Sequence, residues 1–378
     1  MHFSDVTGQT LAKQGLQSLW HNQKLPHALM LVGKEGTGGL PLALALAQYI
    51  FCENKQGNDS CGQCAACSKM LKLAHPDLHL TFPTISPKPG VKASSKAFIN
   101  DFREFVKQTP YSSTFDWLQF INAENKQGNI TAEECREIID VLNLTSFEGG
   151  YKIQIIWRPE YLGKEGNILL KLIEEPPAHT FILMVAEDVE DVLKTILSRT
   201  QLVHLLPLTT TEIAEALVAK DNIEPKRAAQ VAMLAEGSYS NALQLLRYTG
   251  NDLLAPLREW FNGIFTNNGV GINKWVDDMA KTGREQQKNF LLFTQQLLSH
   301  AMRITFIPSH HPALPDDEAT FAGKLAQRKF SASIFQKMDE ALNKTIYHIE
   351  RNAHSKTQLL HLSIQFQYII QGLELKAF

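Results

Sequence analysis

The chain has 378 residues, of which 44% are apolar, and its formal net charge is −2. This length is sufficient for two or three domains with separate cores. The lack of a basic excess argues against a dedicated DNA-binding domain, whose affinity would come largely from neutralising phosphates. No apolar run approaches the ~20 residues that span a bilayer, and the first residues show no secretory signal. We therefore expect a soluble, cytoplasmic protein without a membrane partner.

The first half of the chain predicts an α/β domain built on a parallel sheet. Apolar runs bounded by turn signals indicate strands, and the segments between them have helical patterns. The predicted strands are Ala28–Val32, Lys152–Trp157, Phe181–Val185 and Leu202–Leu205. The predicted helices are Leu11–Trp20, Leu42–Phe51, Thr131–Leu144, Ile168–Glu174 and Val189–Leu197. Thr131-Ala-Glu-Glu134 has the form of a capping box, which marks the start of its helix.

The second half of the chain predicts helices only. Strand signals fade after Pro207, and three short helical segments follow at Thr209–Ala219, Pro225–Ala235 and Asn241–Tyr248. From Asp252 the pattern is helical to the end, with a break near Pro308–Pro315. We therefore expect three domains: an α/β core at 1–206, a small helical lid at 207–250 and a helical domain at 251–378.

One stretch of the core, Thr84–Asn129, does not fit the alternating pattern. It contains Pro-Lys-Pro-Gly and Ser-Ser-Lys, a partly helical segment at Ala97–Gln108, and three aromatic residues that we expect to be exposed, Tyr111, Phe115 and Trp117. Long loops inside a domain are usually functional or disordered. We interpret this stretch as an insertion whose role the sequence leaves unassigned.

The glycine-rich turn after the first strand has the frame of a phosphate-binding loop without its chemistry. Gly33 and Gly38 keep the spacing of G-x-x-x-x-G-K-[S/T], but Gly39 replaces the lysine that neutralises phosphate, and Leu40 replaces the hydroxyl that holds Mg²⁺. Pro41 also removes an N–H group from the start of the helix. A merely flexible turn is the simpler interpretation, but the strand–loop–helix context and a second altered motif argue against it.

That second motif lies at the end of the predicted strand Lys152–Trp157. A P-loop ATPase of the AAA+ type ends this strand in Asp-Glu, in which the aspartate holds Mg²⁺ and the glutamate polarises the attacking water. Here Trp157 and Arg158 occupy those two places. Neither side chain can bind a cation or act as a base, so two separate sites argue against ATP hydrolysis by this chain.

Four of the five cysteines predict a metal site. Cys52 is followed, after eight residues, by Cys61, Cys64 and Cys67, and four thiolates can complete the tetrahedral coordination of a structural Zn²⁺. Four buried, reduced cysteines are the simpler alternative. An iron–sulfur cluster is a weaker one, because the bacterial run with a cysteine before proline is absent. Cys135 lies alone on a predicted helix and is interpreted as a core residue.

Arg199 follows Ser198 at the end of a predicted helix and precedes the last strand. An arginine near a helix C-terminus usually interacts with the helix dipole or with solvent. The residue alone therefore does not indicate a function.

Together these features resemble the bacterial clamp-loader subunits of the DNA polymerase III delta-prime and gamma/tau group, over nearly the whole chain. The motifs that carry the resemblance, besides the glycine loop and the cysteines, are Leu25–Leu29, His75–Asp77, Leu144–Lys152, Leu172–Pro177, Thr195–Thr200 and Ile349–Ala353. The resemblance implies an AAA+ core with a zinc module at 52–67, a helical lid, and a C-terminal collar that holds an oligomer together.

The resemblance also implies a role for Arg199. In this family the arginine of Ser-Arg-Cys reaches into the ATP site of a neighbouring subunit, so Arg199, with Ser198, is expected to be an arginine finger acting in trans. The cysteine of that motif is Thr200 here. The implied partners are gamma/tau and delta subunits, with the sliding clamp contacted indirectly and primed DNA contacted through the assembled complex.

The departures from the family pattern favour the delta-prime branch. Gamma/tau subunits keep the loop lysine and Thr/Ser, whereas this chain has neither, and the lid sequence Gly237-Ser-Tyr-Ser240 lacks the nucleotide-sensing arginine of Gly-Ser-x-Arg. The leading hypothesis is a subunit that does not hydrolyse ATP and serves a neighbour's ATP site. Two alternatives stay open: an active clamp-loader ATPase with an atypical loop, and a zinc-containing AAA+-like protein–protein adaptor in DNA repair.

Overall fold

A computed structural model describes residues 1–86, 93–123, 126–148, 150–247, 251–307, 314–350 and 353–372. The chain divides into two compact units, Met1–Gln244 and Leu245–Phe378. The expected boundaries at residues 206 and 250 stay predictions. Tyr248, most of the break near Pro308–Pro315, and parts of the Leu144–Lys152 and Ile349–Ala353 motifs lie outside the described residues.

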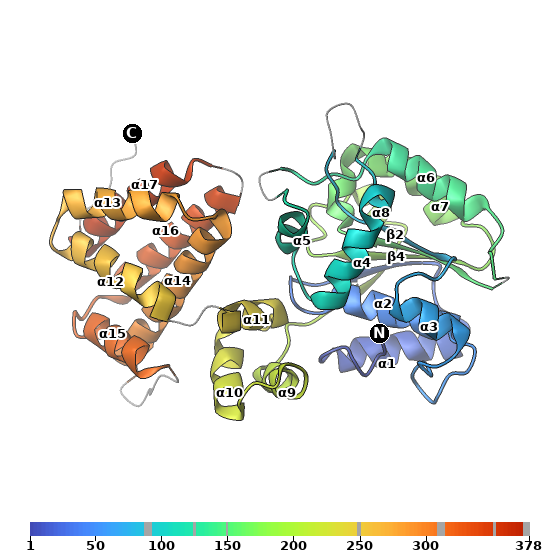
Figure 1. The fold of residues 1–378 in the computed structure, drawn as a ribbon, viewed down its shortest axis with the longest axis horizontal. Helices are drawn as coiled ribbons and strands as arrows, with labels where there is room; N and C mark the ends of the chain where they lie inside the picture. The colour runs from blue at the N-terminus through green and yellow to red at the C-terminus, as the bar shows by residue number, and fades with distance from the viewer. Residues whose placement is uncertain are drawn as a thin grey trace. The chain divides into compact units, whose positions relative to one another are not determined.

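The first unit is built on a parallel sheet of five strands in the order β2-β3-β4-β1-β5 (Figure 1). The strands are β1 (Ala28–Val32), β2 (Leu78–Thr81), β3 (Lys152–Trp157), β4 (Thr180–Ala186) and β5 (Gln201–His204). The sheet confirms the predicted α/β fold class, and β1 and β3 have the predicted bounds. β2 was not predicted, because its four residues Leu-His-Leu-Thr are too few to show a clear strand pattern.

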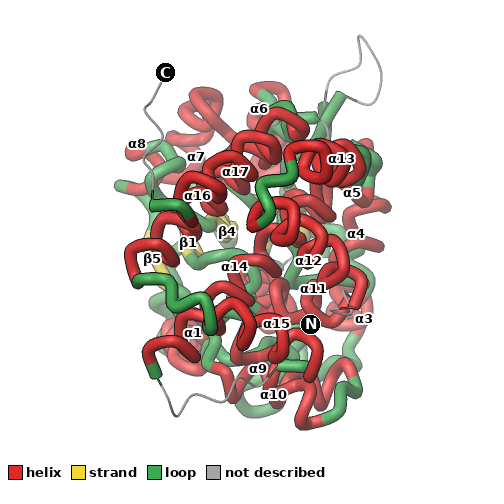
Figure 2. Tube along the Cα trace, turned by 90° about the vertical axis from the view of Figure 1, so that its left-hand side faces the viewer, coloured by secondary structure: helices red, strands yellow, loops and turns green. Residues whose placement is uncertain are grey.

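Helices cover both faces of this sheet, as expected for a sheet whose strands are all parallel. The helices and 3₁₀ segments of the core are α1 (Thr10–His21), α2 (Gly39–Phe51), α3 (Ala65–Leu71), η1 (Ser95–Phe98), α4 (Ile99–Gln108), α5 (Thr114–Phe120), α6 (Ala132–Asn143), η2 (Pro159–Leu169), α7 (Leu170–Glu174) and α8 (Lys194–Leu197). Leu29 and Leu31 of β1 pack in the cluster that contains α1, α2, α4 and α5. Met30 packs with α6, η2, α7 and α8 on the other face, where Cys135 is fully buried, as predicted. Figure 2 shows β1, β4 and β5 of this sheet in yellow.

The predicted helix Val189–Leu197 is helical only over its last four residues, Lys194–Leu197. The backbone N–H of Glu190 donates to the Asp188 carboxylate at 2.9 Å. Such local side-chain bonds favour turns over helix. The prediction was therefore wrong for residues 189–193.

The insertion begins and ends at one point of the core. Thr84 and Asn129 form an isolated antiparallel bridge, with N···O distances of 3.0 and 2.9 Å in the two directions. Trp117 is fully buried, and its Nε1 donates to the Pro83 carbonyl at 2.7 Å. Tyr111 is also buried. The prediction that these two aromatic residues are exposed was wrong: Trp117 of α5 packs in the core, and Tyr111, in the turn between α4 and α5, packs on Tyr239. Phe115 is half-buried.

The capping box predicted at Thr131 is only half formed. The Thr131 hydroxyl accepts from the Glu134 N–H at 3.3 Å, but the Glu134 carboxylate accepts from the N–H of Ser95, in the insertion, at 2.8 Å. Glu134 is only 4% exposed, and burial raises the pKa of this carboxyl to about 7. The insertion therefore contacts α6 through the buried Glu134 carboxyl group, whose protonated form is favoured by burial.

This raised pKa predicts a stability that falls as pH increases. Between about pH 4.5 and pH 7 the unfolded chain releases the Glu134 proton while the folded chain keeps it, so the free energy of unfolding should fall by up to about 3 kcal/mol across this window. Glu134→Gln cannot ionise and should be more stable than wild type at pH 8, by about 1–3 kcal/mol, but not at pH 4.5. Urea denaturation at both pH values measures this. Glu133→Gln is the charge-matched control, and equal pH slopes for Glu134→Gln and wild type would contradict the prediction.

Three helices follow the sheet: α9 (Thr210–Asp221), α10 (Pro225–Leu234) and α11 (Tyr239–Arg247). Thr209 and Glu212 form a complete capping box at the start of α9. Pro225 occupies the first turn of α10, where its missing N–H costs nothing. All three helices were predicted, with ends displaced by one or two residues.

The second unit is helical throughout its described residues, as predicted. Its helices are α12 (Asn251–Phe265), α13 (Gly269–Ala280), α14 (Arg284–Phe306), α15 (Asp316–Ala326), α16 (Ala332–Glu350) and α17 (Ser355–Ile370). Trp260 lies at the centre, stacked on Trp275 with 5.0 Å between ring centroids, and its Nε1 donates to Ser363 Oγ at 2.8 Å. Among all helices in the described parts of the chain, none combines the length and apolarity needed to traverse a bilayer.

Candidate functional site

The glycine loop connects β1 to α2, in the position of a phosphate-binding loop. Gly33 N–H donates to the Ala186 carbonyl at 3.1 Å, which joins the start of the loop to the end of β4. Gly38 has a φ of 98°, which favours glycine. A Cβ atom on Gly39 would lie 2.8 Å from Val185 Cγ1. The backbone at position 39 therefore has no room for the lysine of a working loop unless Val185 moves.

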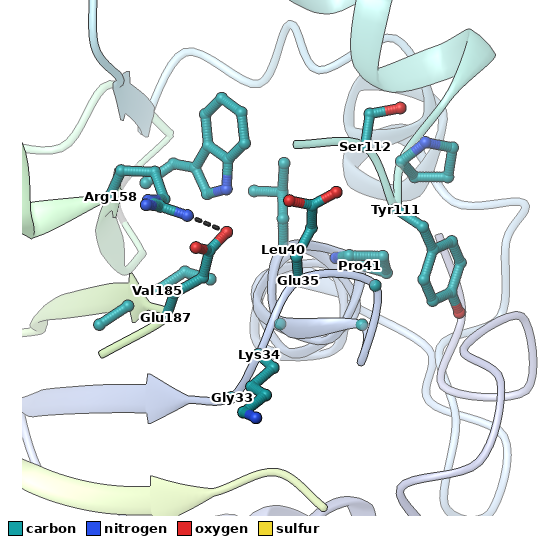
Figure 3. A pocket seen from close by; sticks show the side chains of 16 residues that line it. Gly33, Lys34, Glu35, Leu40, Pro41, Tyr111, Ser112, Arg158, Val185 and Glu187 are labelled. Carbon is teal, nitrogen blue, oxygen red and sulfur yellow. Dashed lines mark ion pairs between the residues drawn. The ribbon is translucent and has the colours of Figure 1, made fainter. Parts of the chain in front are cut away.

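The space above the loop is nearly filled. The cavity there measures about 30 Å³ and is lined by the loop, the start of α2, Pro110–Ser112 of the insertion, and the ends of β3 and β4. That volume holds about one or two waters, whereas pockets for small ligands are typically 300–1,000 Å³. In Figure 3, Arg158 and Glu187 pair on one side, Tyr111 and Ser112 lie on the other, and Leu40 lies between them.

Arg158 places a cation where an ATPase of this class holds carboxylates. Its backbone has a φ of 65°, and its N–H donates to the Val185 carbonyl at 2.8 Å. The guanidinium forms an ion pair with Glu187, and its Nε lies 3.6 Å from Glu160 Oε2. Burial raises the pKa of Glu160, and Arg158 opposes this rise. The cation is thus held by two acidic groups of its own chain.

The pairing of Arg158 with Glu187 was not predicted from the sequence. Trp157 and Val185 are opposite each other in the β3–β4 register, so the residues just after these strands meet at the same edge of the sheet. Because β3 pairs with β4, Glu187 lies beside Arg158. The sequence shows each strand but not which strands are neighbours.

The insertion closes the loop site through Tyr111. Its hydroxyl accepts from the Thr7 N–H at 2.7 Å, and a Cβ on Gly38 would lie 3.1 Å from its ring. Its ring also packs edge-to-face on Tyr239 of α11, with 4.9 Å between centroids. The insertion therefore lies between the loop and the lid helices.

The lid helix α11 contacts the loop directly. Tyr239 N–H donates to the Gly36 carbonyl at 3.0 Å. Ser240 stands at the position of the sensing arginine in the family pattern and is 5% exposed. Its hydroxyl Oγ donates to Glu35 Oε1 at 3.4 Å. A Cβ on Gly36 would lie 2.0 Å from Ser238 Oγ. These contacts tie the lid to the glycine loop.

The four predicted metal ligands lie together. The sulfur atoms of Cys52, Cys61, Cys64 and Cys67 are all within 4.8 Å of one another, close to the ~3.8 Å expected between thiolates on a tetrahedral Zn²⁺ with Zn–S bonds of ~2.3 Å. Cys61 N–H donates to Cys52 Sγ at 3.2 Å, Cys64 N–H to Cys61 Sγ at 3.3 Å, and Cys67 N–H to Cys64 Sγ at 3.4 Å. This arrangement, in which amides donate to sulfurs, could hold a metal ion.

The surroundings favour thiolate at one cysteine in particular. Backbone N–H groups of Gln63 and Cys64 lower the pKa of Cys61 to about 6, whereas burial raises the pKa of Cys52. The Asp59 carboxylate accepts from the N–H groups of Phe3 and Ser4, each at 3.0 Å. The chain start thus supports the loop that carries the cysteines.

Two further sequence motifs meet at one point. The Asp77 carboxylate is 4% exposed and accepts from the N–H groups of Phe147, at 2.7 Å, and Glu148, at 3.1 Å. His75 Nε2 lies 3.2 Å from Glu148 Oε2. The motifs His75–Asp77 and Leu144–Lys152 therefore form one structural junction at the start of β3.

Arg199 lies apart from the glycine loop and near the end of α7. It precedes β5, which runs parallel to β1 with Leu29 opposite Gln201, so the loop and Arg199 lie at opposite ends of the sheet. At ~3.3 Å per residue they are roughly 20 Å apart along the strands. Arg199 forms an ion pair with Glu174, and its Nη1 donates to the Thr195 carbonyl at 3.0 Å. It cannot reach its own loop.

Several known proteins are similar to this chain. The family model described as "DNA polymerase III, delta subunit" matches residues 8–209, more than half of the chain. DNA polymerase III subunit delta' of Escherichia coli (strain K12) is 28% identical over 303 residues, covering 80% of this chain and 75% of that protein. Subunit delta' of Bacillus subtilis (strain 168) is 27% identical, covering 62% of this chain and 57%, less than two thirds, of that protein.

Subunit tau of Bacillus subtilis (strain 168) is 25% identical, over 65% of this chain and 37% of its own length. A solved gamma-subunit-related protein from Thermotoga maritima covers 94% of this chain and 99% of its own, at 15% identity and a TM-score of 0.42.

Proposed function

The chain belongs to the DNA polymerase III delta-subunit family, and from this premise we propose that it is a delta-prime subunit that completes a neighbour's ATP site without hydrolysing ATP itself. The observation that supports this proposal best is the filled loop site. Its cavity of about 30 Å³ leaves no space for a nucleoside triphosphate. Gly39 and Leu40 cannot supply the lysine and the hydroxyl of a working loop.

The other end of the sheet supports the second half of the proposal. Arg199 keeps a guanidinium at an exposed position, roughly 20 Å from its own loop along the strands. An arginine finger stabilises the charge that develops on a transferring phosphoryl group, and it can be supplied in trans. A chain can therefore lose its own nucleotide chemistry and still serve the ATP site of another subunit.

Partners and metal follow from the same proposal. The subunit would assemble with gamma/tau and delta subunits in the cytoplasm, contact the sliding clamp indirectly, and reach primed DNA only through the complex. The second unit would provide the collar of this assembly. The four cysteines would hold one structural Zn²⁺, because all four tetrahedral positions are filled by protein and none is open for catalysis.

We expect the purified chain to show no saturable binding of Mg-ATP up to about 1 mM, a limit that corresponds to about −4 kcal/mol. Calorimetric titration and a phosphate-release assay measure binding and turnover, with a gamma subunit as the positive control. Tyr111→Ala enlarges the cavity, and it should still not hydrolyse ATP, because Gly39, Leu40 and Arg158 are unchanged. Saturable binding with turnover by the wild-type chain would instead favour an active ATPase with an atypical loop.

Affinity purification of the tagged chain from its own cells separates the proposal from the repair adaptor. Gamma/tau and delta subunits should be recovered in stoichiometric amounts. Recovery of DNA-repair proteins without any polymerase III subunit would favour the adaptor.

A further inference from the structure

The guanidinium of Arg199 is held by three groups of its own chain. Nε forms the ion pair with Glu174, and Nη1 donates to the Thr195 carbonyl at 3.0 Å and to Ser198 Oγ at 3.1 Å. Among the described residues, Nη2 has no hydrogen-bond partner. Because the guanidinium is a planar fork with five N–H donors, contacts at two of its three nitrogens fix its plane and leave the Nη2 donors available.

Glu174 is itself placed by the sheet. It is the last residue of α7, which cannot continue because Pro176 and Pro177 follow. The carbonyl of the buried Ile173 lies 2.9 Å from His27 Nε2, and His27 directly precedes β1. The end of α7 is therefore tied to the edge of the sheet from which Arg199 projects.

Both partners are anchored to neighbouring strands. Arg199 N–H donates to the Ile196 carbonyl at 3.0 Å, and Ile196 is fully buried. β5, which follows Arg199, pairs with β1, and His27 lies at the start of β1. The Glu174–Arg199 pair thus joins two rigid attachment points. The pair itself is partly exposed: the side chain of Glu174 is 48% exposed and that of Arg199 is 34% exposed.

We propose that Glu174 is a positioning residue that holds the Arg199 guanidinium ready for the triphosphate of a nucleotide bound to a neighbouring subunit. This inference rests on the proposed function of Arg199. A free arginine side chain samples many rotamers, and ordering it opposes binding. Glu174 restricts the Arg199 side chain before the nucleotide is met, so less conformational entropy is lost when the Nη2 donors contact the phosphate oxygens. Such preorganisation raises the reaction rate.

The experiment measures steady-state ATP hydrolysis by the assembled clamp loader containing Glu174→Ala, Glu174→Gln, Arg199→Ala or the double variant. Glu174→Ala should lower kcat two- to tenfold at the site that Arg199 serves, with the KM for ATP changed by less than twofold. Glu174→Gln keeps an acceptor oxygen for Nε and should recover part of that loss. Glu175→Ala removes the adjacent charge and is the matched control, with no expected effect on kcat.

The double variant separates positioning from a general structural role. If Glu174 acts through Arg199, adding Glu174→Ala to Arg199→Ala should cause no further loss. A further loss, a rate for Glu174→Ala equal to that of Glu175→Ala, or an increased rate would each overturn the positioning role while leaving the proposed function intact. An unchanged rate for Arg199→Ala alone would overturn both.

Discussion

Replacing Arg199 with alanine should lower ATP hydrolysis at the neighbouring subunit's site by on the order of 10³–10⁵-fold, the range found for arginine fingers in other NTPases. The guanidinium would supply positive charge to the transferring phosphoryl group. ATP binding should change much less than the rate, because the contact strengthens as charge develops in the transition state. Single-turnover hydrolysis by the assembled complex measures this effect.

The same substitution should leave the subunit folded. Arg199 is partly exposed and pairs with Glu174, and such exposed pairs contribute about 0–1 kcal/mol to stability. Thermal denaturation of the isolated subunit should show a small shift in Tm. Arg199→Lys keeps the charge but loses the planar fork, so it should recover only part of the rate. Lys194→Ala, in the short helix α8 that precedes Arg199, is the control for lost surface charge, and equal rates for Arg199→Ala and wild type would end the arginine-finger assignment.

Removing the metal should destabilise the cysteine module strongly. The purified chain should contain about one Zn²⁺, because four thiolates converge at one point. If free zinc exceeds the dissociation constant about 1,000-fold, its loss should lower the free energy of unfolding by about 4 kcal/mol. Elemental analysis of the protein and chemical denaturation with and without a chelator measure these two quantities.

Cys64→Ser tests the module with little other disturbance. Cys64 is the N-cap of α3, and its sulfur accepts from the Cys67 N–H. Serine is also a good N-cap, so this variant keeps the cap while losing a thiolate ligand. It should lose most bound zinc, whereas Cys135→Ala, in the core, should keep it. Metal-free protein whose five thiols all react after denaturation would favour simple reduced cysteines, and bound iron would favour an iron–sulfur cluster.

The described C-terminal helices and the lid were largely predictable from the sequence. Their apolar positions recur at the helical period, and caps such as Thr209 with Glu212 mark where a helix begins. β1 was predicted with its observed bounds because it is a continuous apolar run, and β3 was predicted with its observed bounds because it is apolar except for Lys152 and Gln154. These signals lie within short stretches of chain. β2, with four residues, was too short to carry one.

The sequence alone also predicted the cysteine cluster and the altered loop, because both depend on spacing within one segment. Only the tertiary structure paired Arg158 with Glu187, placed Tyr111 over Gly38, and joined Arg199 to Glu174. These partners are 25 or more residues apart. Their contacts depend on the order of the strands and on how the insertion folds back. A local pattern encodes the period and the ends of an element, whereas the neighbours of an element are fixed only when the whole sheet has formed.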